Sequence, residues 1–367
     1  MLARMDLDRI RAALSRTPRL GARGLHALLE ACEGDMGRAL VPESLDRACL
    51  SPAARAYLES PDEAACRADA DWLRASGARL VLHGEPDYPA QLLALASPPV
   101  GLFILGDPLV LQSSQVAIIG SRNPTSGGRD TARNFAADLA RAGLTITSGL
   151  AVGIDAASHE GALLAGGMTI AVCGTGLDQV YPRAHAGLAR RIREHGALVS
   201  QFPPRTCLRR GNFPCRNRLI SGLARGVLVV EASLRSGSLA TAQLAARQGR
   251  RVLAVPGSVR NPLARGCHWL IRAGAELVED PSQVLSAFNL SLSNEGLAGG
   301  SRPVGIGRVL DNEYEMLLDA LAFEPATIDL LAERTGRSCE SVASMLLILE
   351  LEGRVAPQPG GRYGPLS

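Results

Sequence analysis

Arginine side chains are concentrated in the segment 209–218, whose sequence is RRGNFPCRNR. It combines four arginines and two asparagines with one aromatic ring, Phe213, and its glycine and proline predict a bent loop. No Asp or Glu occurs between Glu194 and Glu231, so no carboxylate close in sequence neutralises these charges. Guanidinium groups bind phosphates in a two-pronged geometry, and aromatic faces stack on unpaired bases. The pattern indicates a polyanion site, first of all for single-stranded nucleic acid; a solvated basic loop with Phe213 in the core is the alternative.

Four further motifs follow apolar runs of the kind that form buried strands. They are Gly120-Ser121-Arg122, the segment 148–155 that contains Gly149, Gly174-Thr175-Gly176-Leu177-Asp178, and Glu231-Ala232-Ser233 with Ser236-Gly237-Ser238. Glycine allows close approach of the backbone to a phosphate, and the N-terminus of a following helix favours negative charge. Each motif alone is ordinary turn chemistry. Four of them at the strand ends of one sheet, beside the charge of Arg122, predict an anion-binding crevice.

Several enzyme classes are disfavoured by the residues present. All 39 basic residues are arginine, so no Walker A, Schiff-base or kinase-type lysine exists. The dinucleotide fingerprint is missing after the first strand, and Gly174-Thr175-Gly176 lacks the third glycine at Gln179. Asp155 and His159 lie four residues apart on one predicted helix; we expect the first to cap that helix and the second to anchor it. We therefore expect no catalytic residue and no cofactor.

Composition places further bounds on the chain. The net charge is +3, so any anion site must come from local clustering. The eight cysteines contain no C-x-x-C pair, which argues against a zinc ribbon, and we expect no metal site. The N-terminal segment carries Asp6 and Asp8 without a long apolar run, and no run reaches membrane-spanning length. We expect a soluble protein of the reducing cytoplasm.

Six apolar runs alternate with helical patterns between residues 79 and 281. They are 116–120, 144–148, 169–173, 197–200, 227–230 and 252–255. Continuous Val, Ile and Leu strands separated by helices indicate a parallel sheet covered on both faces. With right-handed crossovers, this predicts an extended Rossmann-like, doubly wound α/β domain.

Three further parts are expected around this domain. Residues 1–78 read as a helical domain of the SAM or helix-hairpin-helix type, with a hairpin at 17–25. Residues 282–306 are rich in Ser and Gly and predict a linker. Residues 307–367 predict a winged helix: helices at 314–321 and 327–334, a third helix capped by Ser338, and a hairpin at 354–363. Because the third helix is acidic, we expect this module to contact protein rather than duplex DNA.

With these residues assembled, the chain resembles the DprA/Smf family of DNA-processing proteins, strongly between residues 85 and 280. The matching positions are Tyr88-Pro89, Gly120-Ser121-Arg122, Ser148-Gly149-Leu150-Ala151, Gly153-Ile154-Asp155, His159, Gly174, Gly176-Leu177-Asp178, Tyr181-Pro182, Phe213-Pro214, Arg216-Asn217-Arg218, Ile220, Glu231-Ala232, Ser236-Gly237-Ser238-Leu239, Thr241-Ala242, Pro256-Gly257, Gly266 and Leu270-Ile271. The resemblance implies a homodimer that binds and protects single-stranded DNA during natural transformation. It also implies loading of the RecA recombinase onto DNA held by the single-strand-binding protein.

The residues and the resemblance together define one expected DNA site. Its members are Gly120, Ser121, Arg122, Gly149, Arg209, Arg210, Asn212, Phe213, Arg216, Asn217, Arg218, Ser236 and Gly237. Two positions depart from the family pattern: Gln201 replaces a usual glutamate, and Arg210 stands where lysine is frequent. We expect a non-enzymatic mediator. The alternatives are a nucleotide-binding enzyme of the phosphoribohydrolase type, whose P-G-G-x-G-T-x-x-E motif has no match here, and a transcriptional regulator.

Overall fold

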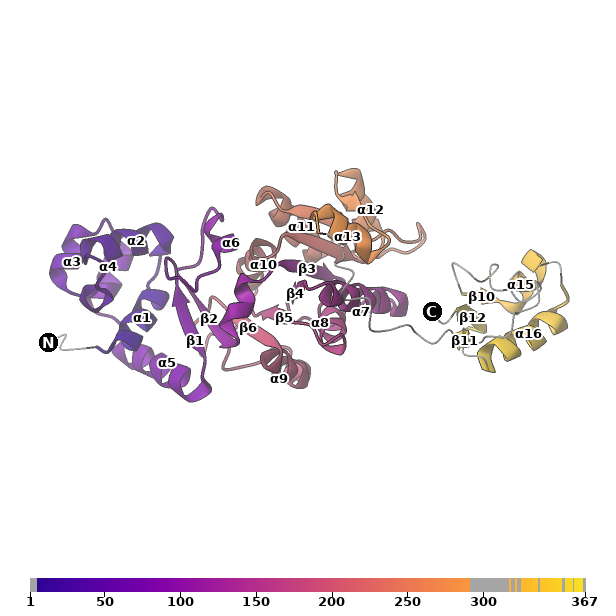
Figure 1. The fold of residues 1–367 in the computed structure, drawn as a ribbon, viewed down its shortest axis with the longest axis horizontal. Coiled ribbons are helices and arrows are strands. Elements are labelled where there is room, and N and C mark those ends of the chain that lie inside the picture. The colour runs from indigo at the N-terminus through magenta and orange to yellow at the C-terminus, as the bar shows by residue number, and fades with distance from the viewer. Residues whose placement is uncertain are drawn as a thin grey trace. The chain divides into compact units, whose positions relative to one another are not determined.

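The computed structural model describes residues 5–290 and, in the C-terminal part, residues 317, 321, 325–335, 337–351, 354–358 and 360–365. The chain divides into two compact units, Met1–Gly296 and Leu297–Ser367, and each is described by itself. Figure 1 shows the elements of both units. No described helix has the length and apolar character needed to cross a bilayer.

The first unit begins with a cluster of short helices. They are α1 (Leu7–Arg16), α2 (Gly21–Ala31), α3 (Pro42–Arg47), α4 (Pro52–Glu59) and α5 (Glu63–Ser76). Side chains of Asp6, Ser51 and Asp62 cap α1, α4 and α5 by accepting from backbone N–H groups in the first turn. The helices pack through fully buried leucines, among them Leu14, Leu25, Leu28 and Leu58. The helical hairpin expected at 17–25 is present as α1, the connection 17–20 and the start of α2.

A nine-stranded sheet forms the centre of the first unit, in the order β1-β2-β6-β5-β4-β3-β7-β8-β9. The six expected strands are β3 (Gln115–Gly120), β4 (Thr145–Ser148), β5 (Thr169–Val172), β6 (Gly196–Ser200), β7 (Gly226–Val230) and β8 (Arg251–Ala254), all in parallel pairs. The sequence analysis missed three: β1 (Arg79–Leu82), β2 (Gly101–Gly106) and β9 (Glu276–Leu277). Because β1 and β2 are antiparallel, the sheet is mixed at one edge.

Helices cover both faces of the sheet, as expected for a doubly wound domain. They are α6 (Ala90–Leu93), α7 (Ser126–Arg141), α8 (Ile154–Leu164), α9 (Ala186–Glu194), α10 (Asn212–Leu223), α11 (Gly237–Arg247), α12 (Arg265–Arg272) and α13 (Pro281–Ala287). Alternate residues of β3 separate the two cores. Val116 and Ile118 pack with α7, α8 and α13, whereas Ala117 and Ile119 pack with α10, α11 and α12. The strand order reverses beside β3, the position at which such sheets build a binding crevice.

One part of the expected linker is a helix instead. The Ser-rich composition predicted a linker from residue 282, but α13 spans Pro281–Ala287 and Asp280 caps it. Val284, Leu285 and Phe288 are buried in the core under α7. Burial of these apolar side chains outweighs the local preference of serine for turns. The remaining linker, 291–306, lies outside the described residues.

The second unit has the elements of a winged helix. Helices α15 (Ile328–Thr335) and α16 (Cys339–Leu351) pack with a three-stranded sheet of β10 (Ala326–Thr327), β12 (Arg362–Pro365) and β11 (Val355–Gln358), in that order. The Oγ of Ser338 accepts from the backbone N–H of Ser341 at 3.3 Å, which confirms the expected cap. Most of the helix expected at 314–321 lies outside the described residues, but Leu317 and Leu321 are buried in this core.

A buried carboxylate joins the helical cluster to the sheet domain. Asp69 on α5 has no exposed side-chain surface and binds both Arg16 of α1 (Nε–Oδ2, 2.5 Å) and Arg205 of the loop after β6 (Nη2–Oδ1, 2.6 Å). Arg16 also donates to the carbonyl oxygen of Pro204. Arg205, which lies in an acid-free window of the sequence, is therefore neutralised in space by a residue far away in the chain.

Replacing Asp69 with alanine leaves Arg16 and Arg205 without their shared acceptor. We expect the free energy of unfolding to fall by about 1–3 kcal/mol, measured by chemical denaturation. Asp71→Ala is the control, because Asp71 is an exposed carboxylate on the same helix; its effect should stay within about 0.5 kcal/mol. An Asp69→Ala protein as stable as the parent would show that this pair does not hold the two parts together.

Candidate functional site

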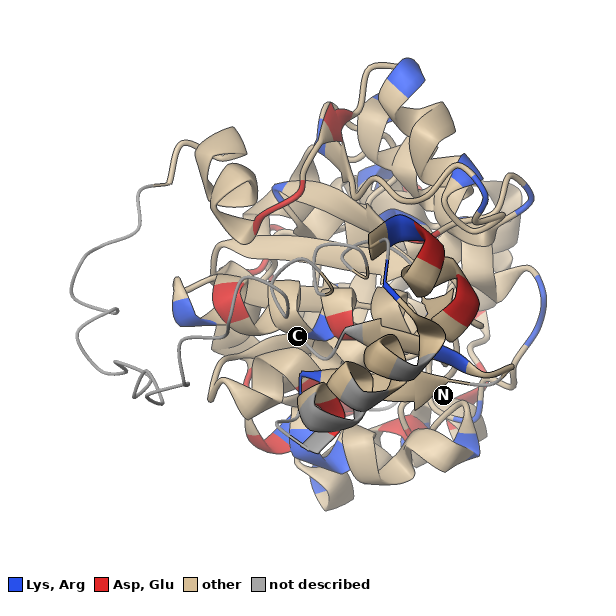
Figure 2. Cartoon of the chain, turned by 90° about the vertical axis from the view of Figure 1, so that its right-hand side faces the viewer, with Lys and Arg blue, Asp and Glu red and all other residues tan. Residues whose placement is uncertain are grey.

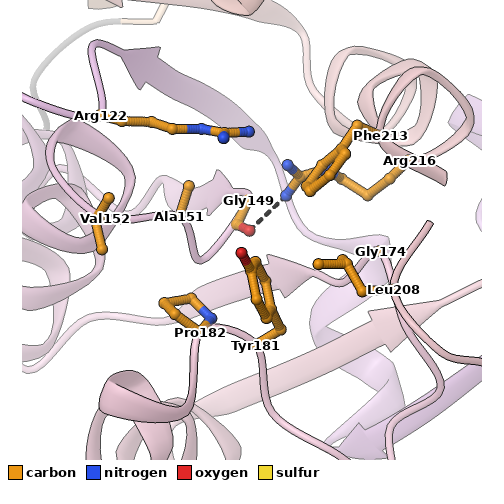
Figure 3. Close-up of a pocket in the computed structure, with 10 residues that line it drawn as sticks. All are labelled: Arg122, Gly149, Ala151, Val152, Gly174, Tyr181, Pro182, Leu208, Phe213 and Arg216. Atoms are coloured by element: carbon orange, nitrogen blue, oxygen red, sulfur yellow. Dashed lines mark hydrogen bonds between the residues drawn. The ribbon is translucent and has the colours of Figure 1, made fainter. Parts of the chain in front are cut away.

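A small pocket opens at the carboxyl edge of the sheet, where the loops after β3, β4 and β5 meet the start of α10. Figure 3 shows its lining: Arg122, Gly149, Ala151, Val152, Gly174, Tyr181, Pro182, Leu208, Phe213 and Arg216. Its volume is about 90 Å³. Pockets that enclose small-molecule ligands usually measure roughly 300–1,000 Å³. The pocket therefore suits one phosphate or part of one base better than a whole enclosed cofactor.

Arg122 is the exposed charge at this pocket. It follows β3, makes no ion pair with any described residue, and places its guanidinium carbon 5.2 Å from the centre of the Phe213 ring. The backbone beneath it is fixed, because Ser121 donates to the carbonyl of Glu231 at 2.7 Å and accepts from the N–H of Ile154 at 3.1 Å. The cation is thus presented from a rigid strand end without a carboxylate partner.

The nearby carboxylate of Glu231 has other partners. It accepts from the N–H and the hydroxyl of Thr125, at 2.8 and 2.7 Å, and from the side-chain amide of Asn261 at 3.0 Å. Those three bonds hold the loops after β3, β7 and β8 together. Glu231 is therefore a structural residue of the crevice and leaves the charge of Arg122 available.

Arg216 lies beneath the pocket and is buried, with only 5% of its surface exposed. Its Nη1 donates to the carbonyl of Gly149, at the end of β4, and to that of Val172, in β5, the second at 2.9 Å. Burial lowers the pKa of Arg216, opposed by attraction to Asp155. Burial raises the pKa of Asp155, although Arg216 and backbone donors around residues 149–151 favour its charged form. Arg216 acts mainly as a strut between two strand ends.

Phe213 contacts both the buried Arg216 and the exposed Arg122. Phe213 and Arg216 are three residues apart on α10 and share one helix face. The guanidinium carbon of Arg216 lies 5.9 Å from the ring centre, and that of Arg122 lies 5.2 Å away. Cation–π contact of this kind is worth roughly 0.5–2 kcal/mol, more where water is excluded. Arg122, Phe213 and Arg216 therefore form one cluster.

The segment expected as a bent loop is largely helical. Helix α10 begins at Asn212, so only residues 209–211 of the arginine-rich segment precede it. Pro214 is accommodated because it lies in the first turn, where its missing N–H removes no helical hydrogen bond. The side chains of this segment therefore point in different directions around the helix, whereas a loop was expected to bring them together.

Arg218 is one residue that the helix directs elsewhere. Two positions after Arg216, it points away from the pocket and donates to the carbonyls of Ser97 and Cys215 and, at 2.6 Å, to the Oε1 of Gln201. The structure therefore does not bring Arg218 together with Arg122 at the pocket, although the sequence analysis grouped both in one expected site. Gln201, where the resemblance led us to expect a glutamate, supplies a neutral acceptor here.

The other expected site residues divide into three groups. Arg209 and Arg210 are exposed just before α10, next to the pocket residue Leu208, and neither forms an ion pair with a described residue. Asn212 is buried and donates to the carbonyls of Gly174 and Cys207, so its role is structural. The remaining members, Gly120, Ser121, Asn217, Ser236 and Gly237, do not line the pocket.

Gly120 and Ser236 shape the crevice without lining the pocket. A side chain at Gly120 would collide with the carbonyl of Val230, and Gly120 itself accepts from the hydroxyl of Ser238 at 2.6 Å. Ser236 caps α11 by accepting from the N–H of Ser238. They order the strand ends next to Arg122 rather than face the pocket.

Asp155 and His159 both have structural roles, but Asp155 does not cap its helix as expected. Helix α8 has no side-chain cap, and Asp155, in its first turn, accepts from the N–H of Ala151 in the preceding loop. His159 is fully buried, and its Nδ1 lies 2.7 Å from the hydroxyl of Thr169. Burial lowers the pKa of His159 to about 3, so the ring is neutral near pH 7 and too weak a base to hold a proton there. Among the described residues, no group of His, Cys, Asp or Glu side chains has the arrangement of a metal site.

Tyr181 is a pocket residue that the list of expected site residues missed. Its side chain is 51% exposed and rises from the loop after β5 toward Gly149 (Figure 3). The signal was present in the sequence, because Tyr181-Pro182 follows a strand end and belongs to the family pattern. It was not recognised as a site residue because it lies outside the arginine-rich segment 209–218.

Charge elsewhere on the molecule is mixed. Figure 2 shows arginines and acidic residues interspersed along the helices and loops. Much of this charge is paired, for example Arg133 with Asp130 and Arg141 with Asp138. Arg122, Arg209 and Arg210 differ from these in forming no ion pair with a described residue.

Gly149 cannot carry a side chain without disturbing this pocket. A Cβ there would lie against the Arg216 guanidinium and 2.7 Å from Oδ2 of Asp155. We expect Gly149→Ala to lower the free energy of unfolding by about 1–3 kcal/mol in a denaturant titration. Gly237→Ala is the control, since nothing lies within 4 Å of its added methyl group, and should be neutral or slightly stabilising. Equal stabilities for the two variants would contradict the packing described here.

The neutral state of His159 predicts a pH dependence of stability. Because the pKa is about 6.5 in the unfolded chain and about 3 in the folded one, the unfolded chain binds more protons between these values. The free energy of unfolding should therefore fall as pH falls below 6.5, by up to about 1.4 kcal/mol per pH unit from this group. His159→Gln should show a shallower fall between pH 6.5 and 5, whereas the exposed-site control His26→Gln should follow the parent. Identical slopes for all three would exclude this role.

Comparison with known proteins gives consistent matches over most of the chain. A family model described as DNA recombination-mediator protein A matches residues 79–289, and a DprA winged helix domain model matches residues 307–361. Protein Smf of Escherichia coli is 43% identical over 298 residues, which cover 79% of this chain and 78% of that protein.

Two solved structures are similar in fold. The X-ray structure of DNA processing protein A from Streptococcus pneumoniae superposes with a TM-score of 0.66 at 34% identity, covering 77% of this chain and 98% of that one. A DNA processing protein A structure from Helicobacter pylori, whose title describes a single-stranded DNA binding mode, gives a TM-score of 0.53 at 28% identity and covers 58% of this chain and 95% of that one.

Proposed function

The chain belongs to the DNA recombination-mediator protein A family, and on that premise we propose that it binds single-stranded DNA at the pocket around Arg122. Arg122 would bind a phosphate, and the exposed Arg209 and Arg210 would bind the neighbouring backbone as it leaves the pocket. The Helicobacter pylori relative, which is described as binding single-stranded DNA, supports this choice of ligand.

One observation carries the proposal: an exposed, unpaired guanidinium is held rigidly among apolar and aromatic side chains at a strand-end crevice. A surface arginine without a function usually moves freely or pairs with a carboxylate. Here Arg122 forms no ion pair with a described residue, and the carboxylate of Glu231 in the neighbouring loop is bonded to Thr125 and Asn261. The combination of fixed cation and aromatic surface is what a single strand requires.

The same geometry disfavours the enzymatic alternative. The pocket is smaller than those that enclose nucleotides, and the buried Asp155 and His159 are bonded to protein groups rather than directed at a substrate. Glu231 precedes the Ser236-Gly237-Ser238 motif, whereas the phosphoribohydrolases place their glutamate after a glycine loop. We therefore propose a mediator without catalytic residues.

The wider role follows from the family. We propose that the protein protects incoming single-stranded DNA in natural transformation and loads RecA onto DNA that the single-strand-binding protein covers. It would act as a homodimer in the cytoplasm. The described part of α16 shows no basic residue in its last turn, so we propose that the winged helix binds protein rather than duplex DNA.

Arg122→Ala and Arg210→Ala test the site. Each removes one phosphate contact, so we expect about tenfold weaker binding of an oligothymidine and a log–log salt slope shallower by about 0.7, measured by fluorescence anisotropy over a salt series. Arg247→Ala is the matched control: Arg247 is exposed and in the last turn of α11, so it lies at the opposite end of that helix from the crevice.

Two outcomes of this experiment would count against the proposed site. Parent-like affinity and salt slope in both Arg122→Ala and Arg210→Ala would refute the assignment of DNA to this pocket. An equal loss in Arg247→Ala would show that binding depends on overall charge rather than on a defined site.

A further inference from the structure

We propose that Tyr181, rather than Phe213, is the surface on which an unpaired base stacks, and that Phe213 positions Arg122. This inference rests on the proposed binding of single-stranded DNA and assigns the two aromatic rings of that site. It reverses the expectation that the sequence gives for Phe213.

The surroundings of Phe213 argue against stacking on its ring. The guanidinium groups of Arg122 and Arg216 lie 5.2 and 5.9 Å from the ring centre, and both arginines line the pocket themselves. Both guanidinium groups therefore lie close to the ring. A base that stacked on the face covered by Arg122 would have to displace Arg122, the residue assigned to the phosphate.

The ring of Tyr181, unlike that of Phe213, is exposed and free of such contacts with the described residues. Its side chain is half exposed, and among the described residues no ring or guanidinium stacks on it and no group bonds to its hydroxyl. Figure 3 shows it below Gly149 in this view, with the hydroxyl directed toward that glycine. A ring with a free face and a free hydroxyl, next to a phosphate site, suits a base, which offers an aromatic face and polar edges.

The loop that carries Tyr181 is fixed in place. Four residues later, the Nδ1 of His185 lies 2.9 Å from the carbonyl of Leu150, in the loop that supplies Gly149 and Ala151 to the pocket. The Tyr181 side of the pocket and the Arg216 side are thus both attached to the loop after β4. A platform held in this way loses little conformational freedom when a base binds.

Binding to two ligands of equal phosphate content separates the roles. The probes are an oligothymidine and an oligomer of the same length built of abasic sugar phosphates. The parent should prefer the oligothymidine by about five- to a hundredfold. Tyr181→Ala should reduce this preference to near one, and Tyr181→Phe, which keeps the ring, should retain most of it. Phe213→Leu should keep the preference but show a shallower salt slope, by about 0.7, because Arg122 is no longer held.

Photo-crosslinking gives a second readout that needs no variant. An oligonucleotide containing 5-iodouracil is irradiated with the full chain, and the product is cleaved after arginine. Tyr181 then lies in the peptide 142–183 and Phe213 in the peptide 211–216, which mass spectrometry resolves. We expect the nucleotide on the first peptide; crosslinking confined to the second would overturn the assignment.

The binding outcomes are equally distinct. Loss of the base preference in Phe213→Leu with its retention in Tyr181→Ala would overturn the assignment while leaving the proposed DNA binding intact. Equal binding of the two probes by the parent would likewise overturn the assignment of Tyr181 while leaving the proposed DNA binding intact. Failure of the parent to bind either probe would contradict the proposed function itself, and this inference with it.

Discussion

The buried guanidinium of Arg216 holds the crevice together. It crosses from α10 to the ends of two strands, binds the carbonyls of Gly149 and Val172, and is balanced by the buried carboxylate of Asp155. Loss of this side chain would leave two buried carbonyls without this donor and would remove the cation that attracts Asp155, a change that typically costs several kcal/mol. Phe213 packs on this strut and Arg122 packs on Phe213. The position of the exposed charge therefore depends on a buried one.

Most of the α/β fold was predictable because both faces of its sheet are buried. Strands of this kind are continuous apolar runs, and the runs at 116–120 and 227–230 correspond to β3 and β7 almost residue for residue. The antiparallel strands β1 and β2 were missed because their pairing is non-local and no long helix follows either of them. Helix α10 was missed because Gly211 and Pro214 are turn residues, although proline is tolerated in a first turn. Local composition was misleading wherever tertiary burial decided the structure.

The site was predicted in part, for a reason that follows from helix geometry. Arg122, Gly149, Phe213 and Arg216 do line one pocket. Residues two apart on a helix point to nearly opposite sides. With Arg216 at the pocket, Arg218 is therefore directed away from it. Because the segment was expected to be a loop, this separation could not be predicted. Arg205 could not be judged either, since its partner Asp69 is 136 positions away. Acid-free sequence windows describe charge along the chain, whereas neutralisation occurs in space.

Hydrogen–deuterium exchange of the full chain, with and without a saturating oligothymidine, tests most directly whether the Arg122 pocket is the DNA site. The loops that form it supply backbone N–H groups from 121–125, 149–153, 174–182 and 208–213, and those amides should exchange more slowly in the presence of the oligonucleotide. Amides of the C-terminal half of α11, at the far end of that helix, should be unchanged. Protection confined to the N-terminal helices or to the winged helix, with the four loops unaffected, would contradict the central claim.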